Sequence, residues 1–185
     1  GTNFTDSLLV GHATTGTLSS AERNTGVGIE ALDALTSGDN NTAIGYAAGS
    51  ALTTGGEQVL IGAGAGDAIT TSQYNVGIGR NALGAISTSA NGNVAIGRNA
   101  MKDSTAAGYN VAVGVSALED TTGYYNIAIG TSAGSNITSG TGNVIIGYNV
   151  DADSATSNRQ LKIVGADDST TTTWISGDSN GVVTL

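Results

Sequence analysis

Residues 41–45 read Asn-Thr-Ala-Ile-Gly and residues 93–97 read Asn-Val-Ala-Ile-Gly, and similar pentads recur through most of the chain. Nine copies begin at residues 7, 24, 41, 58, 75, 93, 110, 126 and 143, with spacings of 16 to 18 residues. A near-constant period is typical of a repeat protein, in which each unit packs against its neighbours. The spacing predicts about eight stacked coils of 17 residues.

Each position of the repeat has its own chemistry. The fourth position is always Val or Ile, the fifth is always Gly, and the eighth is Ala in seven copies. β-Branched side chains favour strands, and a recurring glycine indicates a positive φ or a close approach between chains. We therefore expect an all-β fold, a parallel β-solenoid in which the fourth-position side chains form a continuous core. A helical turn at the sixth to ninth positions, as in residues 98–101, is an open alternative.

The third position of the pentad is mostly Gly or Ala. Because neighbouring strand residues point to opposite faces, we expect this column to lie outside if the fourth position lies inside. Such a strip of small side chains would let subunits approach closely around a threefold axis. The column consists mainly of Gly26, Ala43, Gly77, Ala95, Ala112 and Ala128.

The first position of the pentad is Asn in seven copies: Asn24, Asn41, Asn75, Asn93, Asn110, Asn126 and Asn143. One interpretation is a polar row that binds a ligand, and the other is a structural ladder of amides that hydrogen-bond from coil to coil. The Ser/Thr column at the thirteenth position has the same two interpretations. The ladder is the interpretation we favour for both.

The repeats divide the chain into a lead-in (1–6), the solenoid (7–150) and a C-terminal β cap (151–185). The cap contains three short candidate strands, at 160–164, 171–175 and 181–185, with turns at 167–169 and 177–181. An open solenoid end needs covering because exposed strand edges pair with other molecules. We expect Trp174, the only tryptophan, to pack beneath the last coil.

Composition excludes several classes of protein. The chain has 29 Gly, no Cys and no Pro, and its formal net charge is −9. The absence of Cys excludes disulfides and thiolate sites, and the acidic balance disfavours nucleic-acid partners and anionic lipid surfaces. No apolar run reaches the 18 or so residues of a membrane span.

Few residues are suited to catalysis. His12 is the only histidine, and the carboxylates near the tenth and eleventh positions fall at predicted turns, where acids are normally solvated. These are Asp33, Asp67, Asp103, Glu119 and Asp120. We expect a protein that is not an enzyme, with no cofactor and no metal, although a cation bound between coils is an alternative.

Four tyrosines are candidate receptor-binding residues. Tyr74, Tyr109 and Tyr125 directly precede the repeat Asn, and Tyr124 lies beside the last of them. Exposed rings suit stacking on sugar faces, with the hydroxyl as a polar group. Packing over neighbouring coils or across a subunit contact is the alternative.

The Asn-Thr-Ala-Ile-Gly and Asn-Val-Ala-Ile-Gly repeats resemble those of phage tail fibre proteins, and are related in motif to the heads of trimeric autotransporter adhesins. The segments 161–164 and 174–179 resemble the region that often precedes a fibre's C-terminal chaperone. The resemblance implies a homotrimer of parallel solenoids in the virion, outside the cell, serving as a fibre shaft or receptor-binding tip.

The resemblance leads us to expect a structural and host-recognition module that adheres to a bacterial cell-surface glycan or protein. The repeat is longer than that of adhesin heads, and no coiled-coil stalk or outer-membrane anchor is present, which favours the phage interpretation. A fragment of a bacterial surface adhesin is the alternative. An ice-binding or surface-binding solenoid is a further one, although position 14 does not supply a second Thr column.

Overall fold

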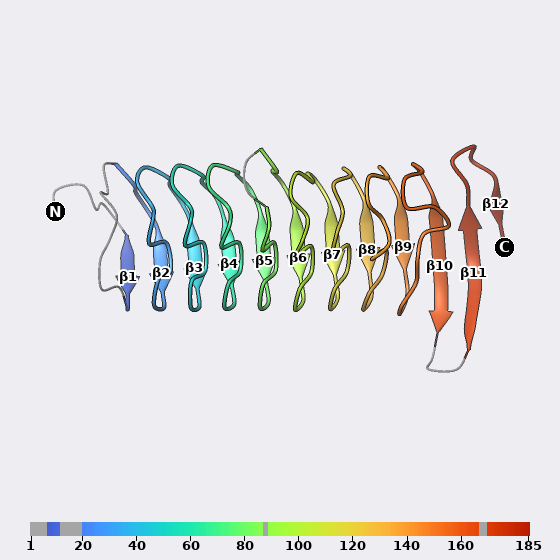
Figure 1. Ribbon diagram of the computed structural model, residues 1–185, viewed down its shortest axis with the longest axis horizontal. Helices are drawn as coiled ribbons and strands as arrows, with labels where there is room; N and C mark the ends of the chain where they lie inside the picture. The colour runs from blue at the N-terminus through green and yellow to red at the C-terminus, as the bar shows by residue number, and fades with distance from the viewer. Residues whose placement is uncertain (1–6, 12–19, 87–88, 167–169) are drawn as a thin grey trace.

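The computed structural model describes residues 7–11, 20–86, 89–166 and 170–185. Its strands form one sheet whose spatial order follows the chain from β1 to β12 (Figure 1). The strands are β1 (Leu8–Val10), β2 (Thr25–Val27), β3 (Thr42–Ile44), β4 (Val59–Ile61), β5 (Val76–Ile78), β6 (Val94–Ile96), β7 (Val111–Val113), β8 (Ile127–Ile129), β9 (Val144–Ile146), β10 (Leu161–Ala166), β11 (Thr171–Gly177) and β12 (Val183–Thr184).

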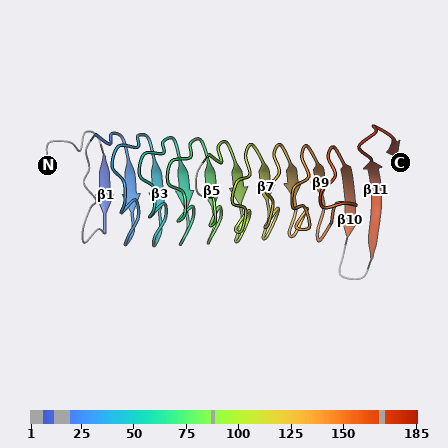
Figure 2. The same cartoon turned by 45° about the horizontal axis from the view of Figure 1, so that its top comes forward.

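The predicted parallel β-solenoid is confirmed. Strands β1 to β10 pair in parallel, each with the equivalent residues of the next coil, as in Thr42 with Val59 and Ile44 with Ile61. The turns also bond from coil to coil: the amide of Ala47 donates to Ile29 O at 2.9 Å, and that of Thr53 to Thr70 O at 2.9 Å. The coils therefore stack as a rod, with β1 near one end and β12 near the other (Figure 2).

The prediction about which strand residues form the core is wrong. Ile44, Ile61 and Ile78 are vertical neighbours, as predicted, but they point away from the interior. The third-position column, predicted to lie outside, is buried in every coil from β2 to β9. The solenoid is so narrow that this column meets the side chains of the opposite wall, and small residues leave room for them.

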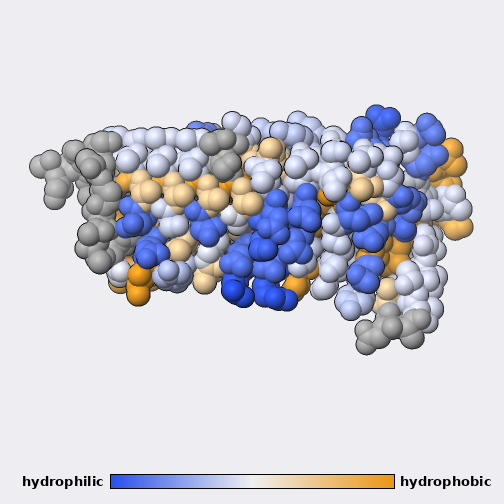
Figure 3. Space-filling model, viewed as in Figure 1, coloured by the Kyte–Doolittle hydropathy of each residue, from blue (hydrophilic) through white to orange (hydrophobic). Residues whose placement is uncertain are grey.

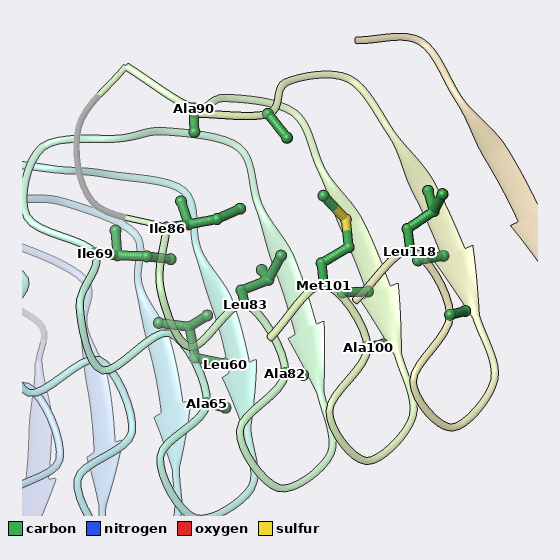
Figure 4. Close-up of a cluster of buried hydrophobic side chains, with 14 of the residues drawn as sticks. Leu60, Ala65, Ile69, Ala82, Leu83, Ile86, Ala90, Ala100, Met101 and Leu118 are labelled. Carbon is green, nitrogen blue, oxygen red and sulfur yellow. The ribbon is translucent and has the colours of Figure 1, made fainter. Parts of the chain in front are cut away.

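Residues from the turns fill most of the interior. The eighth-position alanines are fully buried, and so are the twelfth-position residues Leu35, Leu52, Ile69, Ile86 and Ile137. These side chains stack coil upon coil (Figure 4). Large and small side chains alternate across the interior. Leu60 projects towards Gly49 and Gly66, where an added Cβ would lie 2.9 and 2.7 Å from its methyl groups. Conversely, a Cβ on Gly77 would lie 3.0 Å from Leu83 Cδ1.

The fifth-position glycine has both properties predicted for it. Gly62 has a φ of 135°, a conformation that only glycine adopts readily. An added Cβ there would lie 2.5 Å from Gly79 O in the next coil. This column therefore lets successive backbones approach as the sheet spacing requires.

The solenoid continues past Val150. Residues 151–160 complete a coil, and Leu161, Lys162 and Ile163 of β10 pair in parallel with Val144, Ile145 and Ile146. β10 then pairs antiparallel with β11, and β11 with β12. These antiparallel strands form the predicted C-terminal cap, although its first strand also belongs to the solenoid. The predicted turn at 167–169 lies outside the described residues.

The prediction for Trp174 is wrong. Its side chain is 60% exposed and does not lie beneath the last coil. The ring instead covers Gly165 of β10, where an added Cβ would meet Trp174 Cζ2. The register between β10 and β11 shifts here, so that Trp174 has no partner residue in β10.

The open alternative at the sixth to ninth positions is resolved as well. Residues 98–101 form a turn without helix, and the described part of the chain contains no α-helix. Within those same residues, no helix is long and apolar enough to span a bilayer.

Candidate binding surfaces

The asparagine column is a buried, hydrogen-bonded ladder. The amide N–H of Asn41 donates to Asn24 Oδ1 at 2.9 Å, and its Nδ2 donates to the same oxygen at 3.0 Å. Asn41 Nδ2 also donates to Gly55 O at 3.1 Å. The side chain therefore joins two coils and also ties the start of its own coil to its end. Most of the column's polar atoms are used in this way, although Asn75 Nδ2 has no hydrogen-bond partner among the described residues. Because the whole column is buried, it offers no surface to a ligand.

The ladder extends beyond the seven asparagines. Gln58 accepts from Asn75 N through Oε1 at 3.3 Å, and the amide of Gln160 donates to Asn143 Oδ1 at 2.8 Å. Ser7 Oγ accepts from Asn24 N at 2.8 Å. Each of these three residues lies one repeat length from a repeat Asn, and that spacing could have identified it. Ser and Gln can replace Asn here because their side chains also carry an acceptor oxygen.

The thirteenth-position hydroxyls are also used within the rod. Thr36 Oγ1 donates to Thr53 O at 3.0 Å, and Thr53 Oγ1 donates to Thr70 O at 3.1 Å. The same bond joins Thr122 to Thr138 O at 3.0 Å. This column therefore works as a second ladder between coils.

Three of the candidate tyrosines form one aromatic cluster. The rings of Tyr109 and Tyr125 stack with centroids 5.5 Å apart and planes 13° apart, and Tyr124 is tilted against Tyr125 at 6.2 Å. All three are exposed, Tyr125 most of all, at 61%. Tyr74 belongs to the same column as Tyr109, but Gly92 lies between them in that column. The Tyr109 ring covers Gly92 and occupies the space where its side chain would be. The rings therefore pack against one another across neighbouring coils and also remain exposed.

The backbone explains why these rings project outwards. Tyr74, Tyr109 and Tyr125 have positive φ values of 62°, 56° and 58°, in the left-handed region that bulky residues seldom enter. Asn40 and Glu57 in the same column share this conformation. The chain turns here immediately before each buried ladder residue, so the side chain at the turn points to solvent.

A polar groove lies beside Tyr74. It holds about 260 Å³ and spans three coils, and it is lined by Ser37, Asp39, Asn40, Thr54, Gly56, Glu57, Gln73 and Tyr74. Of these residues, only Tyr74 is a candidate binding residue on the sequence alone. Its lining residues occupy the same repeat positions in successive coils, but the residue types at these positions vary from coil to coil, so the repeat pattern does not reveal the groove.

The outer face of the solenoid sheet is apolar. We use the term outer face for the second-position and fourth-position side chains of β1 to β10. Every coil places Val, Ile, Leu or Thr at these positions, and no charged residue occurs among them. Several remain well exposed, including Ile44 at 40% and Ile129 at 42%. The view in Figure 3, by contrast, shows hydrophilic residues gathered near the middle of the rod and again towards its C-terminal part.

The carboxylates considered for chemistry do not converge. Asp67 and Asp103 line a shallow hollow of about 240 Å³ together with Asn81 and Lys102. Desolvation by the adjoining coils raises the pKa of Asp67, although much of the residue stays exposed. Lys102 Nζ contacts Asp103 Oδ2 at 3.1 Å. Within the described ranges, no group of three or more His, Cys, Asp or Glu side chains could hold a metal ion.

His12 and Tyr46 are two further titratable residues. His12 lies outside the described residues. Tyr46, on the exposed turn after β3, hydrogen-bonds Glu30, and this bond together with the carboxylate's charge raises the pKa of the phenol.

Comparison with known proteins adds no relative. No family model, no curated protein and no solved structure matches the chain.

Proposed function

We propose that this chain is a structural and host-recognition module of a phage tail fibre, in which three parallel copies form a rod that adheres to a bacterial cell surface. The resemblance of the repeats supports the viral setting and an extracellular location on the virion. The apolar outer face, which runs the length of the solenoid, is the observation on which the proposal rests.

The outer face supports assembly because a parallel sheet is ordinarily covered on both sides. Parallel strands read as nearly continuous apolar runs, and Val94-Ala95-Ile96 is such a run. In a single chain only the middle residue is covered, while Ile96 stays 38% exposed. The chain has a formal net charge of −9, but none of its charged residues lies on the outer face. A second layer of apolar side chains would be needed to cover this face.

Further copies of this chain fit the face better than an unrelated partner does. The face is only two side chains wide, about 7 Å, but extends over ten strands, about 43 Å at ordinary strand spacing. Three such narrow strips turned towards one axis cover each other along their whole length. This replaces the small-residue strip, which is buried, as the basis for a trimer.

The tyrosines are the proposed recognition residues. The cluster precedes β7 and β8 in the sequence and is not part of the outer face; it consists of Tyr109, Tyr124 and Tyr125. Assembly through the outer face would therefore leave these tyrosines accessible to a receptor. Their stacked and tilted rings present apolar faces with hydroxyl groups at the edge, which suits a glycan. Three copies would multiply weak contacts by avidity.

Light scattering coupled to size exclusion tests the assembly. We expect a particle of three times 18.1 kDa. A monomer would overturn the assembly, and a dimer would overturn the threefold arrangement.

Adhesion of the labelled protein to a panel of bacterial strains tests recognition. We expect binding to some strains, with loss of binding in the double variant Tyr109→Asn, Tyr125→Asn. Asparagine suits the left-handed backbone there, since Asn40 already has a φ of 59° in that column. Tyr148→Asn, at an exposed tyrosine elsewhere, is the control. Absence of binding to every strain, or adhesion that the double variant retains, would contradict the proposed role of these tyrosines.

A further inference from the structure

The polar groove beside Tyr74 results from one missing side chain. In the column two residues before the ladder, a side-chain oxygen accepts the backbone amide of the preceding coil at several steps. Glu22 N donates to Asp39 Oδ1 at 2.7 Å, and Gln73 N donates to Asn91 Oδ1 at 2.7 Å. Gly56 occupies this column between Asp39 and Gln73 and supplies no such oxygen.

The amide of Asp39 consequently faces the groove. A Cβ built on Gly56 would lie 3.6 Å from Asp39 N and 3.0 Å from Asp39 O. Gly108 is in the same column, but there the Tyr124 ring fills the space, 2.9 Å from where a Cβ would stand. Of these two glycines, Gly56 is the one that leaves a hollow.

The walls of the groove supply an aromatic face and several polar groups. Asn40, Glu57 and Tyr74 are stacked in the left-handed column, with φ values of 59°, 59° and 62°. Asn40 Oδ1 accepts from Arg23 Nε at 2.9 Å, which leaves its Nδ2 as a donor, and the Glu57 carboxylate is an exposed acceptor. The lining contains two carboxylates and no cationic residue.

These features match the chemistry of a sugar. A pyranose has an apolar face that stacks on an aromatic ring and a rim of hydroxyls that need both donors and acceptors. The volume of about 260 Å³ is below the roughly 300–1,000 Å³ of pockets for drug-sized ligands, which suits one ring rather than a chain. Asp39 Oδ2 lies 3.9 Å from the Arg23 guanidinium, so the exposed Glu57 carboxylate is the charge that disfavours an acidic sugar and favours a neutral or amino one.

We propose that this groove binds one neutral or amino pyranose of a cell-surface glycan. Tyr74 stacks on the sugar face, Glu57 and Asn40 bond its hydroxyls, and the Asp39 amide donates to an oxygen at the floor. This inference rests on the proposed recognition function and adds to it a second site, separate from the tyrosine cluster.

Saturation-transfer NMR and calorimetric titration of the purified chain test the site. The probes are the methyl pyranosides of glucose, galactose, mannose and N-acetylglucosamine, together with glucosamine and N-acetylneuraminic acid. We expect millimolar binding of at least one neutral or amino sugar. We expect weaker binding or none of the acidic one.

Two variants locate the binding. Gly56→Asn restores the acceptor that Asp39 and Asn91 supply in this column, so it keeps the fold while filling the groove. Tyr74→Asn removes the ring without straining the left-handed backbone. We expect each to weaken binding about tenfold or more, while Tyr148→Asn leaves binding unchanged. Thermal unfolding checks that each variant is folded.

The inference is overturned if no neutral or amino sugar binds, or if binding survives both groove variants. Failure of the wider function is distinguishable from this. If the chain binds the sugar through Tyr74 but adheres to no bacterium, the sugar site is supported and the proposed fibre function is contradicted. If the Gly56→Asn variant adheres as well as the unchanged chain, the fibre function is supported and the sugar site is contradicted.

Discussion

At the scale of single residues, two columns determine how closely the coils stack. The fifth-position glycines allow backbone to lie against backbone, and the ladder amides supply a donor and an acceptor at each step. The glycine column requires the absence of a side chain, and the ladder column requires an amide. Substitutions there should therefore have large effects that neighbouring positions do not show.

Gly62→Ala should destabilise the rod severely, by more than about 4 kcal/mol, or prevent folding. The new Cβ would lie 2.5 Å from Gly79 O in a conformation that alanine avoids. Chemical denaturation followed by circular dichroism measures the loss. Gly142→Asn is the matched control, because Gly142 also has a positive φ of 71° but only Arg159 Cγ lies near, at 3.7 Å. Equal stability of the two variants would show that the close approach is not needed.

Asn110→Ala should cost about 2–3 kcal/mol of unfolding free energy, because it leaves buried partners unsatisfied. Asn110 Nδ2 donates to Gly123 O at 2.9 Å, and its Oδ1 accepts from Asn126 N at 2.8 Å. Asn110→Gln should recover much of the loss, since Gln58 occupies the same rung elsewhere. Denaturant midpoints for the two variants decide this, and a Gln variant no better than Ala would contradict the ladder account.

At the scale of elements, the short strands and the cap differ in what holds them. A three-residue strand such as β5 is stabilised by the strands on both sides and by the side chains that meet its inner residue. β12 has only two residues and pairs with β11 alone. Its position depends on the turn before it, where Asp178 Oδ1 accepts from Asn180 N at 2.9 Å and Val182 N at 3.1 Å.

The β11–β12 turn should therefore loosen in acid. Bonds from the Val182 and Asn180 amides lower the pKa of Asp178. A lowered pKa means that the stabilisation is complete above the ordinary carboxyl pKa and is lost as pH falls through the folded-state value. Amide NMR shifts of Val182 and Asn180 followed against pH should show a midpoint below about 3.9. Asp178→Asn should abolish that transition, and a midpoint at or above the ordinary value would contradict the role of these bonds.

At the scale of the whole molecule, the rod has an apolar outer face on its sheet and varied polar groups on its turns. The turn positions change from coil to coil, from Tyr46 to Arg80 to Thr131, while the outer face stays aliphatic or Thr throughout. Such a division is expected where one side serves assembly and the others meet solvent or a receptor.

The double variant Ile78→Asp, Ile96→Asp should dissociate the proposed trimer while the monomer keeps its coil structure. Both side chains point away from the interior, so the new charges disturb the contact between copies and not the core. Light scattering and far-ultraviolet circular dichroism together separate assembly from folding. Ala63→Asp, at an exposed turn, is the control. A double variant that remains trimeric would show that the copies meet elsewhere.

The sequence by itself determined the period, the strand positions, the glycine bend and the amide column, because each is a repeated chemical requirement at a fixed spacing. It did not determine which side of each strand is buried. In Thr42-Ala43-Ile44 the alternation allows either side, and the preference of β-branched residues for strands holds on both. The tertiary structure decided it through size, because Leu and Ile side chains from the opposite wall leave room only for a small residue in most coils. The groove has the same origin: Gly56, Asn40 and Tyr74 lie in three different coils, and only the stacking of those coils brings them together.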